Sequence, residues 1–195
     1  MKVILASNNK GKIKEFREIL SQFNIEVLSL KDIDFNVEIE ENGHTFLENA
    51  LIKAKTIFDI YHMPVISDDS GLCVQALNEE PGIYSARYCG LETEDERNDL
   101  ILKQMENQID RRAYFHCSIV FYIAEDKYEH FIGRVYGNLD YTKKGDGGFG
   151  YDVIFIPNGY SQTFGELSKE IKNDISHRAN ALKSFIKYLE NDFNN

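Results

Sequence analysis

The sequence predicts an α/β protein with a mixed, twisted β-sheet and flanking helices, on the basis of three observations. In the first half of the chain, short apolar segments alternate with segments whose apolar residues recur at helical spacing. Near the middle, a long segment alternates apolar and polar residues, and the segment after it has the pattern of its hairpin partner. Helices between strands favour parallel pairing, whereas a hairpin is antiparallel, so both kinds of pairing are expected.

The N-terminal elements follow from apolar runs and capping residues. Residues 2–6 form a continuous apolar run typical of a short buried strand. A helix is expected from about Gly11, and a second strand at residues 25–30. Thr45 is expected to cap the next helix, because Glu48 three residues later completes the Thr-x-x-Glu pattern of a capping box.

Strands dominate after Pro64, and the chain is expected to close with a helix that begins near Ser176, a suitable N-cap residue. The other expected elements are strands at 65–67 and 72–77, a polar helix at 93–107, hairpin strands at 112–124 and 128–139, a glycine-rich loop at 145–150 and a strand at 152–156.

Length and composition indicate one globular domain over residues 1–195, without repeats or a linker. No apolar run approaches the ~20 residues that span a bilayer. The N-terminal apolar run ends at Ala6, short of the ~7–15 residues of a signal-peptide core. The cysteines are odd in number and form no Cys-x-x-Cys pair, which favours reduced thiols (Cys73, Cys89 and Cys117). We therefore expect a cytoplasmic protein with no membrane partner.

The formal net charge of −10 disfavours a nucleic-acid partner, because an acidic surface repels a polyanion. A small phosphate ligand remains compatible with this charge, since local lysines and a divalent cation can reverse the field within one site.

The first candidate site lies between the first strand and the first helix. Backbone N–H groups and the positive end of a helix dipole bind anions, and two lysines here suit a phosphate chain. A Walker A pattern is absent, and a polar turn with a capping residue is the structural alternative. The residues are Ser7, Asn8, Asn9, Lys10, Gly11 and Lys12.

Two acidic pairs form the second candidate site. Asp68 and Asp69 end a predicted strand, and Ser70 follows them. Adjacent carboxylates repel, and a hard cation such as Mg²⁺ relieves that repulsion. One of them can instead take a proton from an attacking water. Glu40 and Glu41 precede the helix that carries Lys53. The alternatives are an Asp-Asp turn, solvated surface acids and a snorkelling lysine.

Two further candidate segments lie in the last third of the chain. Phe149, between glycines, is suited to stack on a base, and Asp152 could accept a hydrogen bond from a ring N–H. A glycine-rich turn with a core phenylalanine is the alternative. The second segment, Lys172 to Arg178, is read as a helix start at which His177 and Arg178 oppose the dipole, which favours a ligand there.

Five stretches, in this order, resemble the inosine triphosphate pyrophosphatase family, also called dITP/XTP pyrophosphatases. They are LASNNKGKIKEF, TFLENALIKAK, ISDDSGLCVQAL with PGIYSARY, GGFGYDVIF, and ISHRANALK, and they cover nearly the whole chain. The resemblance implies a fold with two lobes around a deep nucleotide cleft and a homodimer. It also implies Mg²⁺-dependent hydrolysis of ITP, dITP and XTP to the nucleoside monophosphate and pyrophosphate, which cleanses the nucleotide pool.

The resemblance also implies roles for residues of this chain. Asp69 matches the proton acceptor and a metal ligand, Ser70 a substrate contact, and either Glu40 or Glu41 the acidic metal site. The other matches are the triphosphate loop Ser7 to Lys12, the cleft lysine Lys53, and the base-recognition loop Phe149, Gly150, Tyr151 and Asp152. Lys172, His177 and Arg178 match residues that hold the phosphates and the 6-keto edge of the purine.

Some residues depart from the family pattern, and two other functions compete with the first. Val153 stands where proline is usual, Gly165 where alanine is usual, and residues 78–80 replace a more glycine-rich turn. One competing function is a pyrophosphatase of the same fold, of the kind associated with septum formation, with another base preference. The other is a nucleotide sensor without catalysis.

Overall fold

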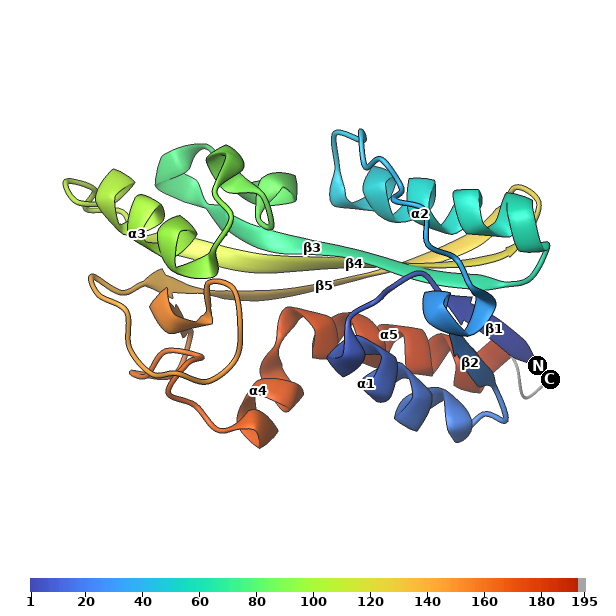
Figure 1. The fold of residues 1–195 in the computed structure, drawn as a ribbon. Coiled ribbons are helices and arrows are strands. Elements are labelled where there is room, and N and C mark those ends of the chain that lie inside the picture. Colours follow the sequence, from blue (N-terminus) through green and yellow to red (C-terminus); the bar gives the residue numbers. More distant parts are fainter. Residues whose placement is uncertain (193–195) are drawn as a thin grey trace. The chain divides into compact units, whose positions relative to one another are not determined.

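The computed structural model describes residues 1–192, apart from the side chains of Glu15 and Asp192. Its strands form a sheet with the order β2-β1-β3-β4-β5-β6 (Figure 1). The strands are β1 (Lys2–Leu5), β2 (Glu26–Ser29), β3 (Val65–Val74), β4 (Arg112–Ala124), β5 (Lys127–Leu139) and β6 (Phe155–Pro157). The helices are α1 (Lys10–Ser21), α2 (Phe46–Tyr61), α3 (Glu94–Gln104), α4 (Lys169–Ile175) and α5 (His177–Asp192).

The sheet is mixed, as predicted. β1 pairs in parallel with β2 and with β3, whereas β5 and β6 are antiparallel. α1 connects β1 to β2, in keeping with the rule that a parallel pair needs a crossover. β4 and β5 are joined by Glu125 and Asp126 only, the connection length of a tight hairpin.

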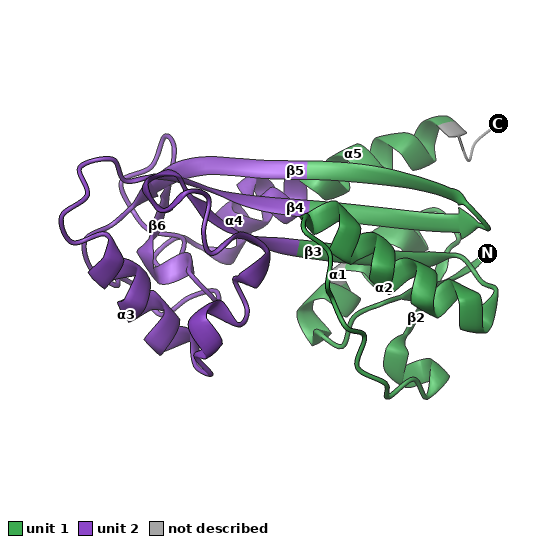
Figure 2. Ribbon diagram, turned by 90° about the horizontal axis from the view of Figure 1, so that it is seen from above, with its two compact units in different colours: residues 1–69, 118–132, 181–195 green, residues 70–117, 133–180 purple. Residues whose placement is uncertain are grey.

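The chain forms two compact units, each built from separate segments (Figure 2). Unit 1 contains residues 1–69, 118–132 and 181–195, and unit 2 contains residues 70–117 and 133–180. The boundaries fall inside β3, β4 and β5, so no linker separates the units in sequence. The description of residues 1–195 as one domain stays a prediction.

In unit 1, helices pack on both faces of the strands. The apolar stripe of α2, with Ala50, Ala54 and Ile57, is buried against residues of β1, β3 and β4. On the other face α5 contributes Phe185, whose ring centroid lies 5.5 Å from that of Phe121 in β4. A fully buried side chain of the size of Ile57 or Phe185 contributes roughly 1.5–3 kcal/mol of transfer free energy.

Thr45 is the N-cap of α2, as predicted. Its hydroxyl accepts a hydrogen bond from the backbone N–H of Glu48 over 3.1 Å. The prediction of a complete capping box is wrong. The Glu48 carboxylate accepts from the N–H of His44 (2.6 Å), one residue before the N-cap, and not from the N–H of Thr45 as a capping box requires. The complete box occurs instead at α3, between Thr93 and Glu96.

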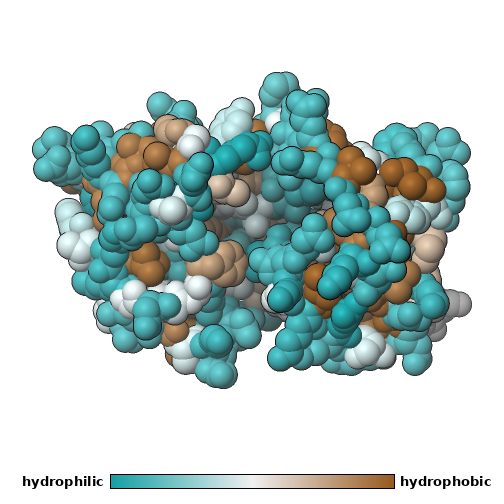
Figure 3. All heavy atoms as spheres, in the orientation of Figure 1, coloured by the Kyte–Doolittle hydropathy of each residue, from teal (hydrophilic) through white to brown (hydrophobic). Residues whose placement is uncertain are grey.

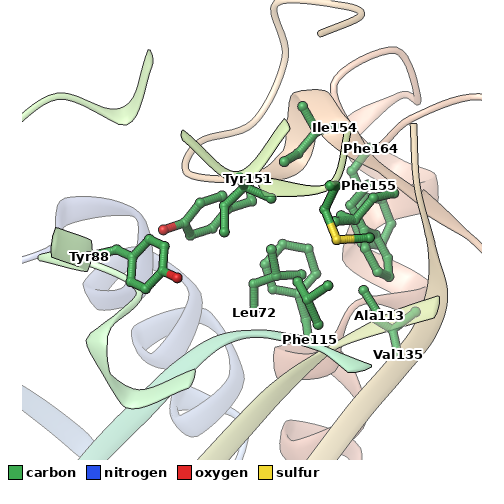
Figure 4. Close-up of a cluster of buried hydrophobic side chains, with 13 residues drawn as sticks. Leu72, Tyr88, Ala113, Phe115, Val135, Tyr151, Ile154, Phe155 and Phe164 are labelled. Carbon is green, nitrogen blue, oxygen red and sulfur yellow. The ribbon is translucent and has the colours of Figure 1, made fainter. Parts of the chain in front are cut away.

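An aromatic cluster forms the core of unit 2 (Figure 4). The ring centroid of Phe155 lies 4.8 Å from that of Phe115 and 5.4 Å from that of Phe164.

Cys73 and Cys117 are buried in strands, as expected for small core residues, whereas Cys89 is exposed. Hydrophilic residues cover much of the molecular face drawn in Figure 3, in keeping with the charge.

Three predicted elements are corrected by the structure. β3 is one strand through Asp68 and Asp69, where two strands separated by a turn were expected. The expected strand at 152–156 begins as a 3₁₀ turn, Asp152–Ile154, before β6. Lys172 lies inside the short helix α4, which the sequence did not predict, so it does not belong to the N-terminus of the last helix.

Two of the three departures from the family pattern, Val153 and Gly165, lie against each other in unit 2. A Cβ atom placed on Gly165 would lie 3.1 Å from Cγ1 of Val153 and 2.7 Å from the carbonyl oxygen of Lys144. The branched side chain at position 153 is therefore accommodated by the missing side chain at position 165.

Candidate functional site

In unit 1, the loop after β1 is organised by a capping asparagine. Oδ1 of Asn9 accepts from the N–H groups of Gly11 (2.9 Å) and Lys12 (3.1 Å). The hydroxyl of Ser7 accepts from the N–H of Asn9 over 3.2 Å. Two N–H groups at the start of α1 are thus already paired with Asn9, and these two are not open to an anion as a phosphate site at this junction would need. Asn8 and Lys10 are exposed.

Lys12 forms a close ion pair with the end of β3. Its Nζ lies 2.6 Å from Oδ2 of Asp68, and the Asp68 side chain is only 1% exposed. Lys12 therefore holds the loop to the sheet and balances a buried negative charge.

Lys53 on α2 joins two other carboxylates in the same unit. Its Nζ lies 2.8 Å from Oε2 of Glu41 and 3.7 Å from Oδ1 of Asp69. Oδ2 of Asp69 accepts a hydrogen bond from Nδ2 of Asn49 over 3.2 Å. Glu40 is exposed, so of the two adjacent glutamates it is Glu41 that faces Lys53 and Asp69.

Burial and charge shift the pKa values of this cluster. Burial raises the pKa of Asp69, Lys53 opposes that shift, and the charges of Glu41 and Asp68 add to it. Burial lowers the pKa of Lys53, but the nearby carboxylates of Asp69, Asp68 and Glu41 outweigh it and raise the pKa. Asp69 is thus a carboxylate whose ionised form is destabilised, as is common for residues that bind a cation or a proton.

Two carboxylates of unit 1, Glu41 and Asp69, are candidate ligands for a divalent cation. Among the residues described, no group of three or more His, Cys, Asp or Glu side chains is arranged to hold a metal. Mg²⁺ commonly takes one or two carboxylates and fills its other positions with phosphate oxygens and waters. Glu41 and Asp69, both neighbours of Lys53, fit that description.

In unit 2, the Asp152 carboxylate organises the glycine-rich loop. Its Oδ2 accepts from the N–H of Phe149 over 2.7 Å and is ion-paired with Lys172. Gly148 has a φ of +78°, and a Cβ there would lie 2.1 Å from Oδ2 of Asp152, so only glycine fits. Burial raises the pKa of Asp152, and Lys172 opposes that shift.

The ring of Phe149 is half exposed and is flanked by two cations. Nζ of Lys172 lies 4.5 Å from the ring centroid and Cζ of Arg178 lies 5.8 Å from it. Phe149 is 50% exposed, so one part of its surface is open to a ligand. Cations within about 6 Å of a ring attract its electron-rich face, and they hold the ring in place.

The remaining candidates in unit 2 differ in exposure. His177 is buried and stacks on Phe115, with ring centroids 4.9 Å apart. Tyr151 is also buried, and its hydroxyl donates to the carbonyl oxygen of Ser85 over 2.9 Å. Ser70 is half-buried in β3. The Tyr151 side chain is therefore committed to the core, whereas the peptide of Gly150 belongs to the exposed loop.

Sequence reasoning missed Asn49, Glu94 and Asn98. Asn49 is fully buried on α2, and a polar residue within an apolar stripe was the signal that could have identified it. Glu94 and Asn98 hold Gly150 by hydrogen bonds. In sequence they lie in a polar helix, where nothing distinguishes them from solvated residues.

The fold and these residues define a class of α/β protein with a lysine–carboxylate cluster in one unit and a cation-flanked aromatic loop in the other. The chain belongs to the Ham1 family, whose model matches residues 3–188. The resemblance noted in the sequence is therefore confirmed, and so is the ITPase-like fold.

Relatives and solved structures agree with this assignment. The chain is 45% identical to a dITP/XTP pyrophosphatase of Listeria monocytogenes, over 96% of this chain and 94% of the relative. It is 41% identical to a dITP/XTP pyrophosphatase of Aquifex aeolicus, over 98% of both chains. The structure of the Staphylococcus aureus Ham1 protein matches with a TM-score of 0.93 and 39% identity, over 98% of this chain and 100% of the other.

Among the residues described, no helix combines the length and apolar character needed to cross a membrane.

Proposed function

We propose that this protein hydrolyses the non-standard purine nucleoside triphosphates ITP, dITP and XTP to the nucleoside monophosphate and pyrophosphate. The observation that carries the proposal is the contact of Lys53 with both Glu41 and Asp69. An arrangement of one lysine between two carboxylates can bind a triphosphate and a cation together. The names of the relatives as dITP/XTP pyrophosphatases support the same reaction.

In unit 1, the lysines would bind the triphosphate. Lys10 is exposed at the start of α1, and Lys12 and Lys53 are held by carboxylates. A bound Mg²⁺, held by Asp69 and Glu41, would supply positive charge to the phosphate oxygens. Positive charge that is already oriented stabilises the negative charge that develops on leaving pyrophosphate.

Asp69 would orient a water molecule and take its proton. The oxygen of that water bonds to the α-phosphorus, and the bond from this phosphorus to the bridging oxygen breaks. The β- and γ-phosphates then leave as pyrophosphate. A carboxylate whose pKa is raised is a better proton acceptor than an ordinary aspartate.

In unit 2, Phe149 would stack on the base, and Arg178 and His177 would donate to its 6-keto oxygen. Adenine carries an amino donor at that position, so donors of the protein would be left unpaired against it. Lys172 matches a phosphate ligand by resemblance. Its contacts with Asp152 and Phe149 support a role in fixing the base loop.

Action in the cytoplasm and assembly as a homodimer complete the proposal: the first rests on the short N-terminal apolar run and the unpaired cysteine pattern of the sequence, the second on the family resemblance. Sedimentation measures the assembly directly.

The decisive experiment measures turnover of ITP, XTP, GTP, ATP and TTP with Mg²⁺, scoring pyrophosphate and orthophosphate separately. We expect pyrophosphate from ITP and XTP, little from the others, and loss of turnover with EDTA. The variant Asp69→Asn should lose about 10²- to 10⁴-fold in kcat, whereas the exposed Asp126→Asn should be active. Orthophosphate as the product, or binding without turnover, would contradict the proposal.

A further inference from the structure

The N-terminal half of α3 presents two pairs of polar side chains to the loop that carries Phe149. Glu94 and Asn98 are one helical turn apart, as are Asp95 and Asp99. Residues at this spacing lie on the same face of a helix. The helix start is fixed by the capping box of Thr93, so these side chains project from a defined position.

The first pair holds the residue after Phe149 by both of its backbone groups. Oε2 of Glu94 accepts from the N–H of Gly150 over 2.8 Å. Nδ2 of Asn98 donates to the carbonyl oxygen of Gly150 over 2.8 Å, and also to that of Glu94 over 2.8 Å. Gly150 has a φ of +63°, and no atom lies within 4 Å of the position that a Cβ would take, so no packing contact at that position restrains it.

Asn98 is 2% exposed, and its Oδ1 has no hydrogen-bond partner among the described residues. A buried polar atom without a partner destabilises the folded state. An apolar residue at position 98 would avoid that cost but could not donate hydrogen bonds. We therefore infer that the function of Asn98 lies in the bonds that its Nδ2 donates to Glu94 and Gly150.

The second pair acts on the chain before the loop. Nζ of Lys143 lies 2.6 Å from Oδ1 of Asp95 and 2.7 Å from Oδ1 of Asp99. These carboxylates are exposed, so the ion pairs add little to the hold compared with the buried amide of Asn98.

We propose that Glu94 and Asn98 are positioning residues that fix the Gly150 peptide and thereby the Phe149 ring for base recognition. The inference rests on the proposed function, because it assigns these residues to the base-binding part of that reaction. Releasing the Gly150 peptide returns about one residue's backbone freedom to the free enzyme, and a ligand must remove it again. The entropy lost when the ligand fixes this peptide weakens binding by roughly tenfold.

The test compares Glu94→Ala, Asn98→Leu and Glu94→Gln with wild type, with Lys103→Met on the exposed face of α3 as the control. We expect KM for ITP to rise about tenfold in Glu94→Ala and Asn98→Leu, with kcat within about threefold and lower preference for ITP over ATP. Glu94→Gln keeps an acceptor for the Gly150 N–H and should restore wild-type KM. Inorganic triphosphate has no base, so its inhibition constant should not change.

A second readout does not depend on turnover. Hydrogen exchange at the Gly150 amide should be slow in wild type and in Lys103→Met, and at least about tenfold faster in Glu94→Ala. Because Glu94 is exposed, this variant should fold even if Asn98→Leu does not.

Unchanged exchange at Gly150, or an active enzyme whose KM and base preference are unchanged in Glu94→Ala, would overturn the positioning role alone. An equal loss of kcat for every nucleotide would also overturn it, since that pattern marks general damage. If wild type turns over no nucleotide, the proposed function fails first, and the exchange measurement still reports the contact with Gly150.

Discussion

Nζ of Lys12 lies 2.6 Å from Oδ2 of Asp68, and this carboxylate is almost completely buried. The pairing bears on the choice between two adjacent aspartates that sequence reasoning left open. Asp68 is committed to a lysine of α1, whereas Asp69 is partly exposed beside Lys53 and Asn49. These contacts support the proposed role of Asp69 as the proton acceptor, whereas Asp68 holds the loop after β1 through Lys12.

Replacement of Lys12 by methionine should destabilise the protein, because it removes the cation that is ion-paired with the buried Asp68 carboxylate. Loss of one partner of a buried ion pair costs about 3 kcal/mol or more of unfolding free energy. Lys10→Met is the matched control two residues away; Lys10 is exposed, and its loss should change stability by less than about 0.5 kcal/mol. Urea unfolding measures both, and equal stability of the two variants would contradict the pairing.

Phe149→Leu should weaken substrate binding without weakening the fold. Stacking on a base contributes roughly 1–3 kcal/mol, so KM for ITP should rise between about fivefold and 150-fold. The ring is half exposed, so the melting temperature should change little. Tyr160→Leu removes another partly exposed ring of the same unit and should leave KM unchanged. A similar KM for both variants would argue against stacking by Phe149.

The long elements were predictable because their patterns are local. The alternation of apolar residues at 112–124 matches the bounds of β4, and Thr45 caps α2 through a neighbour three residues away. The end of the predicted strand at Ser67 was wrong for a physical reason. Adjacent aspartates suggest a turn in sequence, but ion pairs with Lys12 and Lys53 allow β3 to continue through them.

The site was only partly predictable, because sequence identifies residue types but not their partners. The motif around Phe149 indicated a base-binding loop, yet two of the contacts that hold it come from Glu94 and Asn98, 56 and 52 residues away from Gly150 in sequence. The choice of Glu41 over Glu40 likewise depends on which side chain faces Lys53. Hydrogen bonds between distant segments leave no periodic pattern, so only the folded structure reveals them.

His116 should make stability depend on pH. It is buried, and Nε of Arg134 donates to its Nδ1 over 3.0 Å, so that nitrogen must be unprotonated. Burial, with the Arg134 charge, lowers the pKa of His116 to about 4 from an ordinary value near 6.5. The folded state therefore binds fewer protons than the unfolded state between these values. The stability contributed by neutral His116 is present above pH 6.5 and is lost as the pH falls toward 4.

The variant His116→Gln isolates this effect. The contribution of His116 to the loss of unfolding free energy between pH 6.5 and 4 should be at most roughly 3 kcal/mol. The variant lacks this contribution, so its unfolding free energy should fall less than that of wild type over the same range. His130→Gln, at an exposed position, should keep the wild-type slope. Urea unfolding at several pH values provides the comparison, and parallel curves for wild type and His116→Gln would refute the assignment.

Gly145→Ala should destabilise unit 2 more than an ordinary substitution at a positive φ. Gly145 has a φ of +78°, and a Cβ there would lie 2.2 Å from the backbone carbon and oxygen of Gly165. Gly159 has a similar φ of +88° with no atom near the Cβ position, so Gly159→Ala has the conformational cost alone, about 1–2 kcal/mol. Because backbone atoms must move apart in Gly145→Ala, we expect a loss of at least about 3 kcal/mol. Thermal unfolding of the two variants separates the clash from the strain, and equal losses would mean that the backbone at Gly165 yields without cost.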